Sequence, residues 1–380
     1  MKIIIATPLY PPEIGNISLY CQKLARHLSD KDDLKILTYA NQAEIEESLD
    51  FVLVDKHQPL FIRLFKYTWK LFKMSKQADL IYVQNAVAAG LPAIIVKYLR
   101  KIPVVVNFAE DESWKRSTNL CLSERPIEEF LADRDSSAKN KWIMRIQTLV
   151  LRKASKVIVS SKVLADLVAN SYKLDKTKIT HNYNPEDREE KLPFEFKIQK
   201  HQVFTSGPLL DWVGMETIIK AIDIVSDTYS DAQLIISGDG PAKDRLVDLA
   251  ANLEVADRVN FLGKISKAQN WYLRKTSQAY VHNFEGIDIS GQLTQSFLAG
   301  IPVIARDTNI NREIFSDSQC GLLVRDLKAE DLAKKIVQVF SNEELSKDLV
   351  IEARSVLENK FSWAVHIDKL HNIFASLLRK

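Results

Sequence analysis

Cysteine is scarce in this sequence of 380 residues, and its three cysteines lie far apart at Cys21, Cys121 and Cys320. Because no CxxC pair is present, we expect neither a disulfide framework nor a zinc knuckle, and a reducing compartment fits best. Net charge is also small, since 52 Lys+Arg against 49 Asp+Glu leave a formal charge of +3. Strong attraction to nucleic acid is therefore not indicated, and we expect no nucleic-acid partner.

Long apolar runs and low-complexity segments are missing as well. No uninterrupted apolar run approaches the roughly 18–20 residues of a membrane-spanning helix. The apolar stretch at residues 1–6 is too short for a signal-peptide core and leads into Pro8, so we interpret it as a buried first strand. With only 11 Gly and 12 Pro, collagenous and low-complexity classes are excluded. We expect a cytoplasmic protein.

What is present is an alternation of short apolar runs with segments of helical period, in both halves of the chain. Such strands, separated by helices, indicate parallel sheets covered on both faces. Residues 184–200 interrupt the pattern with two prolines and a charged cluster, and we interpret them as a linker. The sequence therefore predicts an α/β fold of two doubly wound domains. The strands expected in the first half are Lys2–Ala6, Leu34–Tyr39, Leu80–Gln84, Val104–Phe108 and Val157–Ser160.

Three glycine-bearing loops follow expected strands, where open α/β sheets bind their ligands. Gly15 and Asn16 follow the first strand, Gly238 begins a Gly-Asp-Gly-Pro stretch, and Ser290 and Gly291 precede a helix. Each loop alone is also explained as a turn, with Gly15 supplying a positive φ. Three such loops spread over two domains are more than turn chemistry needs.

An ordered set of short motifs runs through the whole chain. The motifs are Leu24–Leu28, Gly238–Pro241, Val259–Gly263, Leu298–Ala305, Asn311–Glu313, Gly321–Val324 and Phe361–Trp363. No GxGxxG follows the first strand, as a dinucleotide enzyme would require. The ordered set resembles the retaining glycosyltransferases of family 4, which have the GT-B fold.

The resemblance implies two Rossmann-like domains facing a cleft, with the C-terminal helix returning to the first domain. Residues 1–183 with 363–380 would bind the acceptor, and residues 201–362 the nucleotide-sugar donor. Transfer would retain configuration and need no metal or other cofactor. The expected catalytic residues are Glu285, Glu110 and Asp111. The expected donor-binding residues are Gly15, Asn16, Gly207, Gly238, Leu262, Gly286, Ser290, Gly291 and Gln295.

The sequence departs from the family at the donor site. Pro208 and Val213 stand where the family has the Arg and Lys that neutralise the leaving diphosphate, and Asp211 between them would repel it. Gln295 replaces the second Glu, which usually holds the ribose hydroxyls. Glu285 lies ten residues before Gln295 instead of eight. Either the loop has a two-residue insertion, which we favour, or Ile287 holds the position.

The acceptor side also departs, because an acidic trio at residues 110–112 replaces the family's His. The trio either supplies a polar or basic group to an acceptor hydroxyl or forms a solvated acidic loop. The leading interpretation is a glycosyltransferase acting on a glycan, a lipid-linked acceptor or a small molecule. Two alternatives stay open: a catalytically degenerate GT-B protein that binds a ligand or partner, and an enzyme with another donor, such as a lipid-phosphate sugar.

The segment Lys56–Lys76 has six cations and aromatic residues but no acid. Arg63, Lys66, Lys70 and Lys73 share one helix face, and we expect most of the apolar residues elsewhere. A basic aromatic helix suits an anionic membrane surface, which would make the protein peripheral on the inner face of the membrane. The competing interpretation is a sheet-covering helix with a solvated basic face.

Overall fold

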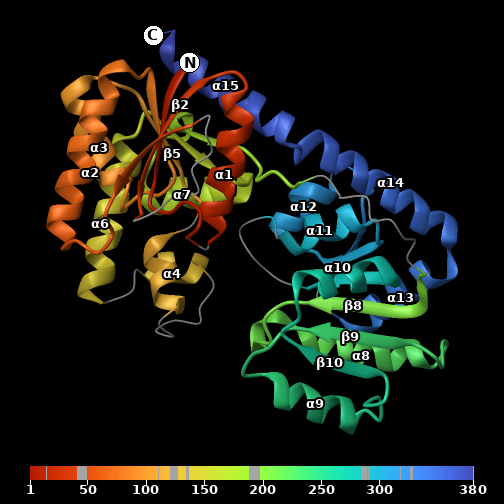
Figure 1. The fold of residues 1–380 in the computed structure, drawn as a ribbon. Helices are drawn as coiled ribbons and strands as arrows, with labels where there is room; N and C mark the ends of the chain where they lie inside the picture. The colour runs from red at the N-terminus through yellow and green to blue at the C-terminus, as the bar shows by residue number, and fades with distance from the viewer. Residues whose placement is uncertain are drawn as a thin grey trace. The chain divides into compact units, whose positions relative to one another are not determined.

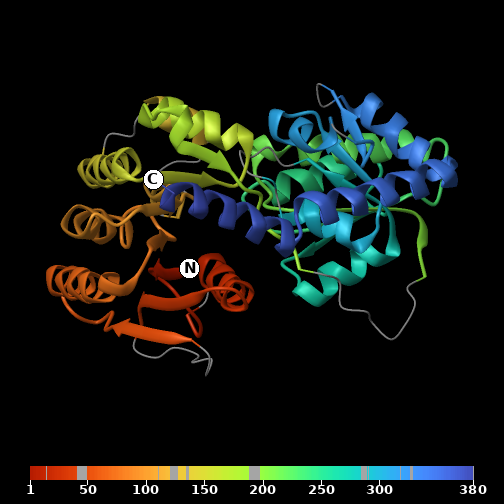
Figure 2. The same ribbon diagram turned by 90° about the horizontal axis from the view of Figure 1, so that it is seen from above.

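The computed structural model divides the chain into two compact units, residues 1–184 with 363–380 and residues 185–362. Figures 1 and 2 show both units, and each is described here by itself. The structure describes residues 1–13, 15–40, 49–109, 111–119, 127–133, 137–187, 197–283, 289, 291–316, 318–325 and 328–379.

The first unit contains a parallel sheet with the strand order β3-β2-β1-β4-β5-β6-β7. Its central strands are buried along most of their length, which explains their continuous apolar runs, such as Ile3–Ile5. The strands are β1 (Lys2–Thr7), β2 (Asp33–Tyr39), β3 (Asp50–Val54), β4 (Leu80–Val83), β5 (Val104–Asn107), β6 (Lys156–Val159) and β7 (Ile179–His181).

Helices cover both faces of this sheet, as a doubly wound fold requires. The helices α2, α3 and α6 lie side by side along one face, and α1 and α15 cover the other (Figures 1 and 2). The helices are α1 (Asn16–Ser29), α2 (Leu60–Met74), α3 (Gly90–Arg100), α4 (Glu112–Asn119), α5 (Ile127–Asp133), α6 (Ala138–Lys153), α7 (Lys162–Tyr172) and α15 (Trp363–Leu378). Two 3-10 turns, η1 (Ser75–Gln77) and η2 (Lys176–Lys178), complete the unit.

The last helix, α15, returns to the first unit, as the sequence predicts. Leu370 and Phe374 on α15 are fully buried in one core with Ile5 and Leu24. The His366 ring is also buried, and its two nitrogens lie 2.8 Å from the Tyr20 hydroxyl and 2.8 Å from a backbone carbonyl. The apolar stripe at helical spacing is therefore the buried face of this helix.

The second unit contains another parallel sheet, with the order β10-β9-β8-β11-β12-β13. The order runs outward from β8 in one direction and from β11 in the other, so the topological switch point lies between these two strands. The strands are β8 (Gln199–Ser206), β9 (Gln233–Ser237), β10 (Val259–Gly263), β11 (Ser277–His282), β12 (Val303–Arg306) and β13 (Leu322–Val324). The helices are α8 (Met215–Ser226), α9 (Lys243–Asn252), α10 (Lys267–Thr276), α11 (Gly291–Ala299), α12 (Asn309–Phe315), α13 (Ala329–Ser341) and α14 (Glu343–Lys360), with a 3-10 turn η3 (Asp211–Val213).

Candidate functional site

The candidate donor site lies at the carboxyl edge of the second sheet. β8 ends at Ser206 and is followed by Gly207, and its neighbour β9 ends at Ser237 and is followed by Gly238. The other neighbour, β11, ends at His282, ahead of the loop that leads to α11. Because the strands are parallel, all three loops emerge at the same edge, next to the switch point.

The loops after β8 and β9 interlock through their backbones. The Gly207 N–H donates to the Ser237 carbonyl at 3.0 Å, and the Gly238 N–H donates to the Gly263 carbonyl at 2.8 Å. Gly238 has a φ of 140°, and a Cβ there would lie 1.8 Å from the Gly207 carbonyl oxygen. Glycine at this position is therefore required by the packing of the two loops, independently of any ligand.

Gly207 and Gly291 are different, because the space around them is open. A Cβ on Gly207 would meet only a methionine methyl at 3.8 Å, and one on Gly291 would meet nothing within 4 Å. Nothing in the described fold demands glycine at these two positions. Their backbones leave room for a ligand to approach closely.

Other expected donor-site residues are exposed, or lie outside the described residues. Leu262 in β10 is 40% exposed, and Gln295 on α11 is also exposed. The described residues do not include Glu285, Gly286, Ser290 or Glu110. The choice between an insertion and Ile287 therefore also falls outside the described residues. For Asn16 the structure describes the backbone at the start of α1 but not the side chain.

The two positions that lack the family's cations differ in their surroundings. Pro208 is exposed in the loop after β8, whereas Val213 is 1% exposed and belongs to the hydrophobic core of the unit. Asp211 was expected to repel a diphosphate, but its carboxylate is paired with Arg245 at 2.8 Å. Arg245 also pairs with Glu216, so the cation is shared between two acids.

A buried arginine contacts residues next to these loops, and reasoning from the sequence missed it. Arg274 near the end of α10 is 1% exposed. Its guanidinium donates to Ser206 Oγ at 3.1 Å, to Ser296 Oγ at 3.0 Å and to Gln292 Oε1. Burial lowers the pKa of Arg274, yet arginine starts so high that the side chain stays charged near neutral pH.

In the first unit, Gly15 is the residue before α1, with a φ of 164°. That is extended backbone, open to any residue, so the interpretation of Gly15 as a turn glycine with positive φ is wrong. A Cβ there would meet a leucine methyl at an ordinary 3.5 Å. Gly15 is therefore not explained by local packing.

Asp111 does not fit the catalytic role expected for it. It is fully buried, and its Oδ1 accepts hydrogen bonds from the Ser113 hydroxyl at 2.6 Å and from the Ser113 and Trp114 N–H groups at 3.0 Å each. Its Oδ2 accepts from Gln147 at 3.0 Å and from the Tyr172 hydroxyl. Both oxygens are saturated by the protein, so Asp111 caps α4 and ties it to α6 and α7.

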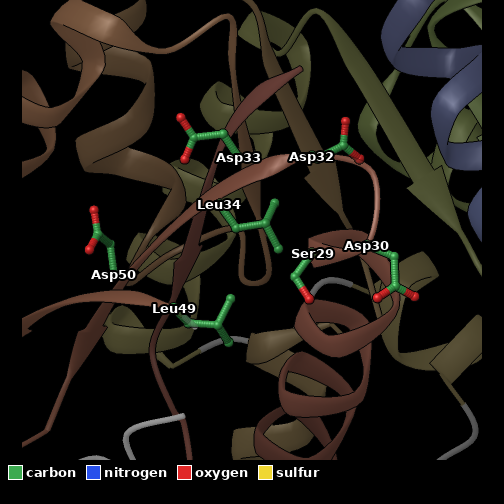
Figure 3. A pocket seen from close by; sticks show the side chains of 7 residues that line it. All are labelled: Ser29, Asp30, Asp32, Asp33, Leu34, Leu49 and Asp50. Carbon is green, nitrogen blue, oxygen red and sulfur yellow. The ribbon is translucent and has the colours of Figure 1, made fainter. Parts of the chain in front are cut away.

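A pocket in the first unit is lined by four aspartates, Asp30, Asp32, Asp33 and Asp50 (Figure 3). Asp33 and Asp50 begin β2 and β3, so the pocket lies at the amino ends of the strands, opposite the edge where such sheets bind ligands. Asp32 is already paired with the N-terminal amine at 2.8 Å and with the His371 ring at 2.6 Å. Within the described part of the chain, no group of His, Cys, Asp and Glu side chains is arranged to hold a metal ion.

The helix α2 presents a different face from the one expected. Phe61, Phe65 and Trp69, one turn apart, are 84%, 70% and 50% exposed, whereas the core contacts come from Tyr67 and Leu71. Phe61 and Phe65 were expected away from the basic face, with Trp69 flanking it, so the expectation for the two phenylalanines is wrong.

The cations of α2 divide into two groups. Arg63 lies over the Tyr39 ring, and Lys70 donates to the Leu53 carbonyl, so both turn toward the protein. Lys66 and Lys73 are exposed beside the aromatic residues. The solvent-facing side of α2 is therefore both aromatic and basic.

Comparisons with known proteins agree with this architecture. Residues 17–190 match the family described as Glycosyltransferase Family 4, and residues 187–356 match the family described as Glycosyl transferases group 1. The two matches follow each other along the chain and meet where the two units divide. The chain belongs to the GT-B glycosyltransferases of the family 4 type.

Individual relatives of this glycosyltransferase are distant in sequence. An uncharacterized glycosyltransferase of Methanocaldococcus jannaschii is 23% identical, with 100% of this chain and 99% of the relative aligned. The phosphatidyl-myo-inositol mannosyltransferase of Mycobacterium tuberculosis is 27% identical over 43% of this chain and 44% of its own length. The crystal structure of Anabaena HepE in complex with UDP has a TM-score of 0.70 at 17% identity, covering 99% of this chain and 100% of HepE. The fold is thus the GT-B fold of two Rossmann-like units.

Proposed function

We propose that this glycosyltransferase transfers a sugar from a nucleotide-sugar donor to an acceptor, with retention of configuration and without a metal. The observation that carries the donor part is the pair of open glycines, Gly207 and Gly291, beside the switch point of the second sheet. Solved structures of the similar protein HepE contain UDP and UDP-glucose, which supports a nucleotide-sugar donor. Retention and the absence of a metal rest on the family resemblance.

In this proposal the second unit binds the donor. The Gly207 and Gly291 backbones approach the diphosphate, Gln295 accepts a hydrogen bond from a ribose hydroxyl, and Glu285 lies at the sugar. Gly238 shapes the loop and Leu262 contacts the base, while Gly286 and Ser290 stay donor-binding candidates by resemblance. Gly15 and Asn16 stay donor-binding candidates of the first unit by resemblance, and Glu110 remains the acidic candidate on the acceptor side.

The test of the donor part is binding followed by turnover. UDP, GDP and ADP, and the UDP and GDP sugars, are screened by thermal shift, since a ligand at a hundred times its dissociation constant stabilises by about 2.7 kcal/mol. A sugar nucleotide that binds is then followed for release of the diphosphate with candidate acceptors. Binding without turnover favours the degenerate GT-B alternative, which the missing cations at Pro208 and Val213 support. No binding of any nucleotide would argue against the donor proposal.

We further propose that the acceptor is lipid-linked and reached at an anionic membrane surface, with the protein on the inner face of the membrane. The helices α2, α3 and α6, which cover one face of the first sheet, contain no Asp or Glu at all. Exposed aromatic and aliphatic side chains recur on all three, including Phe61, Phe65, Tyr98, Leu99 and Trp142. None of the described helices is long and apolar enough to cross a membrane, so attachment would be peripheral.

Charge complementarity is the reason to choose a lipid surface over a protein partner. The helices α2, α3 and α6 contain no acidic residue that could offset their exposed cations, although the whole chain is nearly neutral. Each Lys or Arg near an anionic surface contributes about 1 kcal/mol, and the aromatic rings can insert at the headgroup level. The exposed cations of these three helices are Lys66, Lys73, Arg100, Lys139, Lys141, Arg145, Arg152 and Lys153.

Flotation with vesicles of phosphatidylglycerol and phosphatidylcholine tests this surface. We expect binding at low salt. Binding should weaken as the phosphatidylglycerol content is lowered and as salt is added. The triple variant Phe61→Ser, Phe65→Ser, Trp69→Ser should lose most binding at every salt concentration. The matched control is Ile351→Ser on α14, which removes a side chain that is 64% exposed in the other unit and should change nothing. Equal binding by wild type to neutral and anionic vesicles would contradict the electrostatic part.

A further inference from the structure

Arg274 occupies an unusual place for an arginine. It is the largest of the side chains that are fully buried among the described residues, and it lies where α10 packs against α11 and β8 (Figure 1). Its partners come from two elements: Ser206 ends β8, whereas Gln292 and Ser296 lie one turn apart on α11. The guanidinium also lies over the Phe204 and Tyr280 rings, 5.4 and 4.8 Å from their centroids.

Among the residues that the structure describes, no acid forms an ion pair with Arg274. Its hydrogen bonds in the described part of the chain go to two serine hydroxyls, one amide oxygen and the Asn270 carbonyl, which are all neutral. Burial lowers the pKa of Arg274, and Tyr280 and then Glu186 oppose that shift, but the Glu186 carboxylate accepts a hydrogen bond from the Thr294 hydroxyl at 2.7 Å. Burying a charge without an ion-pair partner lowers the stability of a fold, so the presence of Arg274 is best explained by a function.

The position of Arg274 indicates that function. Ser206 immediately precedes Gly207, and Gln292 immediately follows Gly291, so the guanidinium holds the residues next to both open glycines. It therefore lies at the switch point between β8 and β11, where a ligand of such a sheet binds. One turn earlier on α10, Asn270 contacts Ser237, the residue before Gly238.

We propose that Arg274 is a positioning residue for the donor diphosphate. From its buried position on α10 it provides the positive charge that Pro208 and Val213, in the loop after β8, do not provide. It acts by fixing Ser206 and Gln292, and with them the Gly207 and Gly291 backbones. It also acts through its field, because a charge in a low-dielectric interior reaches further than one in water. This inference rests on the proposed nucleotide-sugar donor.

A ligand series of increasing charge separates this role from a merely structural one. Uridine, UMP and UDP are titrated calorimetrically against wild type, Arg274→Met and Arg274→Lys, with inorganic pyrophosphate as a probe without a base. We expect Arg274→Met to weaken UDP and pyrophosphate by tenfold or more, UMP by less, and uridine by under twofold. Arg274→Lys keeps the charge and should recover most of the UDP affinity. The control is Arg258→Met. Arg258 immediately precedes β10, at the amino edge of the sheet and away from the candidate site, so the affinities for all four ligands should stay unchanged.

The salt dependence gives a second readout. Because a buried charge is screened much less than a surface charge, the ratio between wild type and Arg274→Met for UDP should persist from about 50 mM to about 500 mM salt. If all ligands weaken by the same factor, or if Arg274→Met binds UDP as wild type does, the inference is wrong. If Arg274→Met fails to fold, the Arg274→Lys series and the wild-type pyrophosphate titration decide: no pyrophosphate binding by wild type, or an Arg274→Lys variant that weakens all four ligands by the same factor, overturns the inference. Wild type that binds uridine but neither UDP nor pyrophosphate refutes the role of Arg274 alone, whereas wild type that binds none of them, and none of the other nucleotides and sugar nucleotides of the donor screen, refutes the donor proposal as well.

Discussion

Arg245 on α9 donates from Nη2 to the carboxylate of Asp211, 2.8 Å away, in the loop that follows β8. The acid that the sequence placed beside the diphosphate position is therefore already paired. The pair is mostly exposed, so its contribution to stability is small. The pair does affect the charge of the loop. Because Arg245 already neutralises Asp211, a cation added nearby remains available to a phosphate.

We predict that Pro208→Arg strengthens the binding of UDP. Pro208 is exposed next to Gly207, so an arginine can extend there without disturbing the core. One charge-assisted contact to a phosphate contributes on the order of 1.5–3 kcal/mol, which is about tenfold or more in the dissociation constant. Calorimetric titration measures the change, with Pro208→Gln as the uncharged control of similar length. An equal gain in both variants would mean that loss of the proline, not the charge, is responsible.

Val213→Lys should not restore a donor cation, although the resemblance places the family's Lys at this position. Val213 is 1% exposed and packs in the core with Ile218 and Leu246, so a lysine there would lose its hydration. We expect a loss of on the order of 3 kcal/mol in the free energy of unfolding, measured by urea denaturation. Val213→Ala, which removes the packing without adding a charge, should cost less. A lysine variant as stable as wild type would show that this segment can turn outward.

We predict that acid destabilises both units through two buried histidines. Burial lowers the pKa of His366 in the first unit and of His282 in the second to about 4, with Arg274 adding to the effect on His282. The unfolded value is near 6.5. The folded pKa is therefore the lower one, so the contribution is present above about pH 6.5 and is lost as pH falls toward about 4. By pH 5 each histidine should cost about 2 kcal/mol.

Urea denaturation at pH 7.5 and pH 5 measures this loss. His282→Gln and His366→Gln should each show a smaller drop in stability between the two pH values than wild type does. His57→Gln, which changes an exposed histidine after β3, should show the full drop. Identical pH dependence in all four proteins would refute the assignment to the two buried rings.

The sequence was sufficient to predict the architecture, because the buried strands of a parallel sheet appear in a sequence as continuous apolar runs. Among the strands of the first half it missed β3 and β7, and these lie at the two edges of the first sheet. An edge strand of three residues, such as Ile179–His181 or Leu322–Val324, has neither the length nor the burial that makes a periodic pattern visible.

Two features of the sites could not be predicted, for different reasons. The sequence left open whether the aromatic residues of α2 face a membrane surface or the core, because an apolar residue in a helix does not reveal whether a sheet or solvent faces it. Arg274 was overlooked, because its hydrogen-bond partner Ser206 is 68 residues away in the sequence. Short motifs report local chemistry, whereas a buried charge is recognised only from the elements that fold around it.

Asp111 is the last case, and here the structure changes the expected outcome of a mutation. Its two oxygens hold two N–H groups and three side chains at the junction of α4, α6 and α7. Asp111→Ala leaves these donors unpaired in the interior, so we expect a loss on the order of 3 kcal/mol in stability. Asp166→Ala, which breaks the exposed pair with Lys176 in the same unit, should cost under about 1 kcal/mol.

The conservative variant Asp111→Asn separates a structural role from a catalytic one. An asparagine still accepts hydrogen bonds through its remaining oxygen, so most of the cap survives and the protein should stay folded. For a structural residue, donor turnover per folded molecule then remains within a few-fold of wild type, because no reacting atom meets a fully buried carboxylate. A catalytic acid or base would instead lose 10²-fold or more of its turnover at nearly unchanged stability. Parallel measurements of the urea midpoint and of diphosphate release decide between the two, and we expect the first outcome.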